Sequence, residues 1–385
     1  MVARGRREHG SGLVNGGTAP TGGGAARGGA AAAPAAAPAP AVPAVPPAAL
    51  RGSRPSSRVL LVGAALVLAL LAAILASVAL GSQPVPWPDV LAVLREPGTT
   101  EASAIVWDMR VPRTVLGLLV GIALGVAGAL TQAHTRNPLA DPGLLGVTSG
   151  AACAVVLAIH VLGVTSPSGA VGFALVGALC AGGIVVVLSQ RIRVLAPGVT
   201  LVLTGSIVTA LLASVTSGVL LLDRTTMDVF RFWSIGSLVG RGPEVIWTVA
   251  PFLLLGLLLA VVNAPTLGAL ELGDELGVSL GRHVVRDRLI GLLAVTLLAG
   301  AATAACGSIA FVGLAATHAA TRLGLGGPAW RIPVAGLCGA VLVLGADVVG
   351  RLAPATSEIQ VGIVIALVGA PLFVVLARGY LGDRS

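Results

Sequence analysis

The sequence predicts an all-α, polytopic integral membrane protein of about ten transmembrane helices. Only 10% of the 385 residues are charged, whereas soluble domains average about 25%. Hydrophobic residues make up 56% of the chain, and its mean hydropathy is +0.97. Charge-free apolar runs of roughly 20 residues, the length that crosses a hydrocarbon core of about 30 Å, recur from residue 59 to the C-terminus.

Residues 1–58 differ from the rest of the chain. They are rich in Ala, Gly and Pro and carry seven Arg against a single acidic residue. A segment without apolar periodicity buries too little surface to fold, so we expect a disordered cytoplasmic tail. The first apolar run, Val59–Leu80, has 22 residues and comes too late for a signal peptide. We expect it to remain as an anchor and to open a membrane domain over 59–380.

The remaining apolar runs predict nine further spans. The 142–190 stretch carries no charge but is broken by Ser166-Pro167-Ser168. The 33-residue run 289–321 is divided at Cys306-Gly307-Ser308, so one helix of that pair must be short or re-entrant, which is tolerable only inside protein. The predicted spans are 59–80, 113–133, 144–163, 170–189, 199–221, 246–263, 287–306, 308–322, 333–352 and 359–377.

The arginines predict the orientation of these spans. Ten spans place both termini on one side of the membrane, and with the N-terminus inside the cytoplasmic segments hold 17 Arg against seven outside. Basic residues favour the cytoplasmic side. We therefore expect a multi-pass protein of a bacterial cytoplasmic membrane with its N- and C-termini in the cytoplasm.

The composition excludes or disfavours several function classes. The chain has no Lys, which excludes a Walker A loop and Schiff-base lysine chemistry. The near-neutral body beyond residue 58 argues against nucleic-acid binding. No CxxC pair occurs, so neither a zinc site nor a redox motif is indicated. We assign no metal, cofactor or catalytic residue to the chain. We interpret its four cysteines as small core residues: Cys153, Cys180, Cys306 and Cys338.

Two local patterns indicate close helix packing and sharp turns. Gly117, Gly121 and Gly125 line one helical face and allow a second helix to approach closely. Asn137-Pro138 and Asp141-Pro142-Gly143 are turn signals four residues apart. They predict a structured bend between two spans.

The order of motifs resembles one known family. Arg110-Val111-Pro112-Arg113, an apolar helix, and then Asn137-Pro138-Leu139-Ala140-Asp141-Pro142-Gly143-Leu144-Leu145-Gly146 resemble the FecCD-type permeases, the membrane subunits of bacterial ABC importers for iron–siderophore and vitamin B12 complexes. The resemblance covers about residues 59–380. It continues through Leu203-Thr204-Gly205, Leu272 to Gly281, Gly307 to Leu314, Ala346 to Arg351, Val361 to Val364 and Gly369-Ala370-Pro371.

The resemblance implies a type II ABC importer permease fold and a role in moving an iron(III)–siderophore complex across the cytoplasmic membrane. ATP and Mg would be used by a partner ATPase, and this chain would have no ATPase site of its own. The implied partners are two ATP-binding subunits at the cytoplasmic face, a second permease, an extracytoplasmic substrate-binding protein and the lipid bilayer. Cobalamin and haem are alternative cargoes, and a homodimer and a heterodimer of permeases both fit.

The loop 264–288 is the longest predicted cytoplasmic connection. Leu272, Leu276 and Leu280 recur at every fourth position, on one face of a short helix. The residues alone fit either a docking surface or a buried cap. By resemblance the loop contains the coupling helix that contacts the ATPase, although Gly277 and Val278 depart from the family pattern. The coupling residues would be Leu272, Gly273, Asp274, Glu275, Leu276, Leu280 and Gly281.

The resemblance also assigns an outer docking surface. Arg110, Arg113 and Arg351 match family positions that receive acidic residues of the binding protein, and the planar fork of Arg suits bidentate contact with carboxylates. Anchoring of these side chains at the membrane interface is the alternative. Asp347, one turn from Arg351, could instead pair with it.

An inner gate is implied before the fifth span, at Pro197, Gly198 and Val199. Val199 would close the pore as an apolar constriction, and an ordinary turn is the alternative.

Two other function classes fit the sequence less well. An ion-coupled secondary transporter would need carboxylates at a midplane site, and Asp347 alone comes close. A membrane enzyme would need clustered His, Asp or Glu on one face, whereas the five His are scattered over different loops.

Overall fold

A computed structural model describes residues 57–96, 98–192, 197–279, 281–325, 327–353 and 358–382. All but the last two positions of the predicted tail over 1–58 lie outside these ranges. The helices are α1 (Ser57–Ala79), α2 (Trp87–Arg95), α3 (Glu101–Ser103), α4 (Val111–Thr135), α5 (Val147–Leu162), α6 (Pro167–Arg191), α7 (Pro197–Leu222), α8 (Arg224–Ser234), α9 (Pro243–Asn263), α10 (Leu267–Leu272), α11 (Asp274–Ser279), α12 (Val284–Cys306), α13 (Val312–Leu323), α14 (Pro328–Leu352) and α15 (Val361–Gly382). A π-helical turn, η2 (Ala104–Arg110), and two 3₁₀ turns, η3 (Pro142–Leu145) and η4 (Ala264–Thr266), complete the regular structure of the described ranges, which contain no strand.

The ten predicted spans all correspond to helices, but they are not equally long. Among the described residues, eight helices are long and apolar enough to cross a membrane. The predicted span 144–163 is α5, an apolar helix of 16 residues. The predicted span 308–322 is α13, which has only 12 residues and is too short for a core of about 30 Å. The expectation that one helix of the 289–321 run is short is therefore confirmed.

The break between α12 and α13 has a clear backbone cause. Gly307 ends α12 with a φ of 80°, and a Cβ at that position would lie 2.1 Å from the carbonyl oxygen of Trp233. Only glycine fits a left-handed position with so close a neighbour. The predicted division at Cys306-Gly307-Ser308 is thus confirmed.

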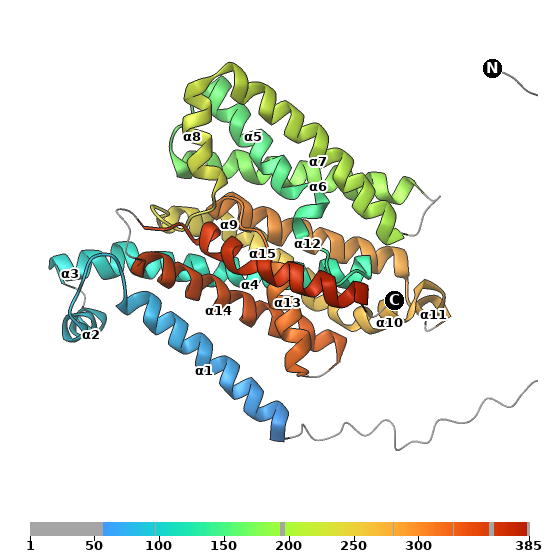
Figure 1. Ribbon diagram of the computed structural model, residues 1–385, viewed down its shortest axis with the longest axis horizontal. Coiled ribbons are helices and arrows are strands. Elements are labelled where there is room, and N and C mark those ends of the chain that lie inside the picture. The colour runs from blue at the N-terminus through green and yellow to red at the C-terminus, as the bar shows by residue number, and fades with distance from the viewer. Residues whose placement is uncertain are drawn as a thin grey trace, which may run out of the picture. The chain divides into compact units, whose positions relative to one another are not determined.

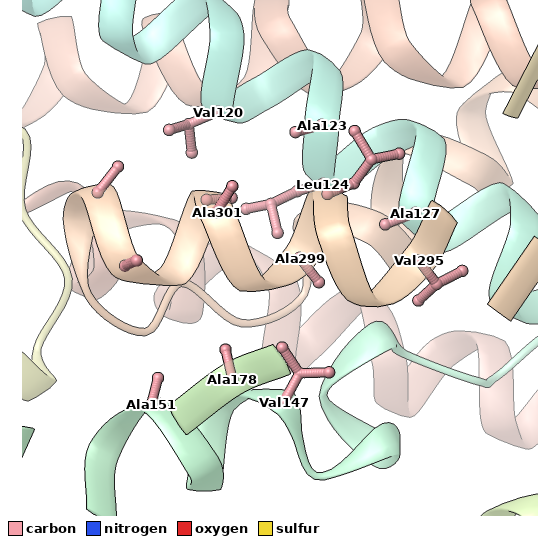
Figure 2. Close-up of a cluster of buried hydrophobic side chains, with 14 of the residues drawn as sticks. Val120, Ala123, Leu124, Ala127, Val147, Ala151, Ala178, Val295, Ala299 and Ala301 are labelled. Atoms are coloured by element: carbon pink, nitrogen blue, oxygen red, sulfur yellow. The ribbon is translucent and has the colours of Figure 1, made fainter. Parts of the chain in front are cut away.

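Helices α4 and α12 form the centre of the bundle in Figure 1. They contact each other, and α4 also packs against α13 and α14 while α12 packs against α6 and α9. Figure 2 shows α12 between the buried side chains of α4, such as Ala123, and those of α5 and α6, such as Ala151 and Ala178. Small side chains at these contacts let the helices lie close together where lipid supplies no hydrophobic drive.

The glycines of α4 confirm the predicted close contact, and the partner is α14. A Cβ at Gly117 would lie 3.0 Å from the side chain of Leu344. At Gly121 it would lie 2.5 Å from Cα of Ala340, and at Gly125 it would lie 2.1 Å from the carbonyl oxygen of Ala335. The two backbones therefore meet along this face.

The bundle has two ends that matter for function. At one end, here called the loop end, α9 ends and α12 begins, joined by η4, α10 and α11. At the opposite end α12 ends beside the 235–242 segment, because the amide of Ser237 donates to the carbonyl of Cys306 at 2.7 Å. The cysteine interpretation holds for Cys153, Cys306 and Cys338, which are buried, and is wrong for Cys180, which is exposed on α6.

Candidate functional site

The loop at 264–288 is helical but does not form the single helix that the leucine spacing predicts. Gly273 has a φ of 117° and separates α10 from α11. Leu272 therefore ends one helix and Leu276 belongs to the next, so the expected common face is wrong for these two residues. A positive φ is accessible to glycine and ends a helix. Gly273 therefore interrupts the helix, although the leucines recur at every fourth position.

Helix α11 presents apolar side chains outward. Leu276 and Val278 are 53% and 62% exposed, and Glu275 is exposed beside them. Gly277 faces inward, where a Cβ would lie 3.1 Å from Val284. Of the other predicted coupling residues, Gly281 has a φ of 77° and is exposed; the side chains of Leu272 and Asp274, and the whole of Leu280, lie outside the described part of the chain.

Hydrogen bonds tie this loop to the centre of the bundle. His134, buried near the end of α4, lies 2.9 Å through Nε2 from Oδ1 of Asn263, the last residue of α9. Asn263 donates through Nδ2 to the carbonyl of Asp287 in the first turn of α12 at 2.6 Å. Arg136 donates through Nε to the carbonyl of Leu270 in α10 at 2.8 Å. These contacts connect α4, α9, α10 and α12 at one place.

Sequence reasoning missed this junction. His134 stood out only as one of several scattered histidines. The position of Asn263 just before the loop was the one available signal, because a polar side chain at the end of an apolar span needs a buried partner.

The predicted bend after α4 is confirmed in detail. Asn137 accepts through Oδ1 from the amide of Leu139 at 3.0 Å, and Asp141 accepts through Oδ1 from the amide of Gly143 at 2.9 Å. Pro142 occupies the first position of η3, which Asp141 caps. Pro138 lies in the turn between these two side-chain caps. The bend fixes the approach of α5 and α7, since α7 packs against η3.

Helix α7 begins at the predicted gate residues. Pro197 is its first residue, and a Cβ at Gly198 would lie 2.6 Å from the carbonyl oxygen of Thr135 at the end of α4. Val199 is 51% exposed and begins an exposed apolar stripe that continues along α7 through Leu203, Ile207 and Leu211. The geometry places Val199 on an outer surface of this chain.

At the opposite end, Arg110 and Arg351 hold the C-terminus of α1. Arg110 donates to the carbonyls of Val78, Ala79 and Gln83 at 3.0, 2.6 and 2.6 Å. Arg351 donates to the carbonyl and hydroxyl oxygens of Ser77, both at 2.8 Å, and to the carbonyl of Leu80. The last carbonyls of a helix lack partners within the helix, and two cations there also complement its dipole.

The third arginine joins a buried and a half-buried carboxylate. Arg113 contacts Asp347 at 2.7 Å and Glu358 at 2.7 Å, and Asp347 also pairs with Arg351. Burial acts to raise the pKa of Glu358, but hydrogen bonds from Ser82 and Arg113 outweigh it, so this pKa lies below its usual range. The pairing of Asp347 with Arg351, considered from the sequence as an alternative to docking, is therefore present.

All three arginines line one cavity, here called the arginine chamber. It has a volume of about 410 Å³ and also contains Arg241 and three carboxylates: Asp108, Glu244 and Glu358. Arg110 and Arg351 are 4% and 5% exposed. Their guanidinium groups thus make hydrogen bonds within the chain and also line the arginine chamber.

A family model and several known permeases match this chain. The model of the FecCD transport family matches residues 68–379. The ferric enterobactin transport system permease protein of Escherichia coli is 40% identical over 330 residues, covering 86% of this chain and 98% of that protein. The Fe(3+)-citrate import system permease protein of Bacillus subtilis is 39% identical over 274 residues, covering 71% and 81%.

A solved structure agrees with the sequence comparison. An inward-facing conformation of a metal-chelate type ABC transporter superposes with a TM-score of 0.72 and 26% sequence identity, covering 82% of this chain and 98% of that one. The fold is therefore that of an ABC importer permease, as the motif order predicted. This chain belongs to the FecCD transport family.

Proposed function

We propose that this chain is the translocation subunit of an ABC importer that carries iron(III)–siderophore complexes across the cytoplasmic membrane of a bacterium. It works as one of two permeases, with two ATP-binding subunits at the loop end and a substrate-binding protein at the opposite end. Both termini lie in the cytoplasm. The ATPases use ATP and Mg, since a chain without Lys cannot form a Walker A loop. The iron–citrate and ferric enterobactin permeases among its relatives support this cargo class.

The observation that carries the proposal is the construction of the loop end. Helix α11 presents Leu276 and Val278 outward, so the surface is open to a partner. Arg136 of α4 bonds to α10 within the same loop, and Asn263, at the end of α9, bonds to the start of α12 where the loop ends. A displacement imposed on α11 is therefore transmitted to the two central helices, which is what coupling to an ATPase requires.

The gate follows from the exposed stripe of α7. We place the second permease against this stripe, because the stripe begins at the proposed gate residue Val199 and the gate residues of two copies must face one another. Val199 from each permease would then narrow the path near the loop end, where Gly198 fixes α7 against α4. An apolar constriction of this kind closes a pore by dewetting.

The docking of the binding protein belongs at the arginine chamber. Its lining has four arginines and three carboxylates, a positive excess of one. This balance supports an acidic partner, with Arg113 as the most accessible of the three predicted docking residues. Arg110 and Arg351 act chiefly by holding α1 in place.

Uptake by cells that lack this chain tests the cargo. Radiolabelled ferric siderophore, haem and cobalamin are supplied separately, and uptake is restored by the wild-type chain. We expect loss of siderophore uptake alone. Loss of cobalamin or haem uptake instead would assign that cargo, and unchanged uptake of all three would refute an importer.

An ion-coupled transporter is disfavoured by the surroundings of Asp347. Within the described residues this buried carboxylate is paired with both Arg113 and Arg351, so it serves as a fixed counter-ion. A coupling carboxylate must instead gain and lose its ion during each cycle.

A further inference from the structure

Arg241, at the end opposite the loop end, has an unusual environment. Its side chain is 8% exposed, and its Nε and Nη1 atoms are enclosed without a hydrogen-bond partner. It makes no hydrogen bond or ion pair with any residue in the described part of the chain. Burial lowers the pKa of this guanidinium, which shows that its surroundings disfavour the charge. A buried cation is normally paired, so a counter-ion is expected from outside the chain.

A second cavity adjoins this side chain and is here called the Trp233 chamber. It has a volume of about 520 Å³ and lies between α5, α6, α8 and the 235–242 segment. Its walls are mainly apolar, with Val155, Ile159 and Phe232 among them. This size and character are those of a small-molecule pocket, in which a few polar groups orient a largely apolar ligand.

Two more polar side chains of the Trp233 chamber lack partners. The indole Nε1 of Trp233, a donor, and the amide Oε1 of Gln360, an acceptor, are both enclosed and unbonded within the described ranges. Buried polar atoms without partners are rare in folded proteins. Three such side chains on one cavity therefore point to a ligand that supplies their missing hydrogen bonds.

The charged side chains nearby do not serve as the counter-ion of Arg241. Asp228 lines the Trp233 chamber but is 61% exposed and faces Arg231 at 3.5 Å. Glu244 lies on the other side of Arg241, in the arginine chamber. The buried thiol of Cys306, at the end of α12, lies near Arg241 but supplies no carboxylate.

We infer that the Trp233 chamber binds an oxyanion, a phosphate or carboxylate group, carried by a small molecule with an apolar part. The Arg241 fork would bind two of its oxygens, Trp233 would donate through Nε1, and Gln360 would accept from a hydroxyl or amide of the same molecule. Arg suits planar bidentate recognition of such groups. The oxyanion has two sources: a dissolved organic anion, or the headgroup of a phospholipid in the adjacent leaflet.

The test uses the full chain in a neutral maltoside detergent, with its five Trp replaced by 5-fluorotryptophan. The fluorine NMR resonance of Trp233 is assigned from the Trp233→Phe variant. Sodium phosphate, sodium citrate and micellar phosphatidylglycerol are titrated separately at constant ionic strength. We expect a saturable shift of the Trp233 resonance with at least one probe, and the responding probe identifies the source. The absence of a saturable shift with all three would overturn the inference.

Four variants make the result specific. Arg241→Gln should weaken the apparent affinity at least tenfold, while Arg231→Gln, an exposed arginine of α8, should change it less than twofold. Equal affinities for wild type and Arg241→Gln would overturn the inference. If Arg241→Gln does not fold, Arg241→Lys, which keeps the charge but loses the fork, should weaken binding at least threefold. Binding that appears only in Glu244→Gln would show that Glu244 occupies Arg241, and would also overturn it.

This experiment contains no ATPase, binding protein or transport step. Its outcome is therefore independent of the uptake experiment, and either proposal can fail without the other.

Discussion

The contact between α4 and α14 gives the sharpest stability prediction. A methyl group at Gly121 would lie 2.5 Å from Cα of Ala340 and 2.6 Å from the carbonyl oxygen of Gly339. Ordinary contact begins near 3.4 Å, so Gly121→Ala must separate the two backbones by roughly 1 Å. Neither neighbouring atom is the end of a flexible side chain, so the strain cannot be relieved locally.

The magnitude follows from this displacement. Overpacking a close contact costs about 1–3 kcal/mol, and moving the helices apart weakens Cα–H···O contacts worth about 0.5–1 kcal/mol each. We therefore expect Gly121→Ala to lower the free energy of unfolding by about 2–4 kcal/mol. Gly345→Ala on α14 is the matched control, because apart from its chain neighbours and the nearby backbone of α14 no described atom lies within 4 Å of its Cβ position.

Unfolding by sodium dodecyl sulfate in mixed micelles, followed by circular dichroism, measures both variants. The control should be unchanged or more stable by up to about 1 kcal/mol, the difference in helix propensity between Ala and Gly. Equal stabilities of the two variants would refute the close backbone contact.

Three further predictions concern the polar networks. Asp347→Leu leaves Arg351 buried without its counter-ion and leaves Arg113 paired with Glu358 alone. It should destabilise the chain by about 3–5 kcal/mol in the same unfolding assay; no loss would show that the pairing is unimportant. Asn263→Ala breaks the link between His134 and α12, so transport should fall more than ATP hydrolysis in the reconstituted importer. Asn263→Gln should restore part of the transport, and a parallel fall of both activities would contradict a coupling role. Because the pKa of Glu358 is lowered in the folded chain, the stabilisation by this carboxylate is complete above the usual carboxyl pKa of about 4.3 and is lost as the pH falls through the lower folded value. Glu358→Gln should flatten the acid side of the profile of unfolding free energy against pH. An unchanged profile would contradict the bond to Arg113.

The sequence predicted features that depend on neighbouring residues. The turn at Asn137 and Asp141, the glycine face of α4 and the end of α12 at Gly307 each follow from local backbone chemistry. The short α13 followed from the length of a charge-free run. The FecCD resemblance then placed these elements in one architecture.

Features that depend on distant contacts were not predicted. The partners of Arg113 lie 234 and 245 residues away, and no periodicity relates such positions. Arg241 entered the sequence argument only as one charge among the outer arginines, because burial without a counter-ion becomes visible only in three dimensions. The division at Gly273 was missed because leucine spacing was given more weight than the glycine within it.

The central claim is that the 264–288 loop receives force from an ATPase. A photoreactive p-benzoylphenylalanine at Leu276, which is 53% exposed at the loop end, tests it in the assembled transporter. The control is the same residue at Trp247, which is 77% exposed near the start of α9 at the opposite end. We predict a cross-link from position 276 to the ATP-binding subunit and none from position 247. A cross-link to that subunit from 247, or its absence at 276, would contradict the account.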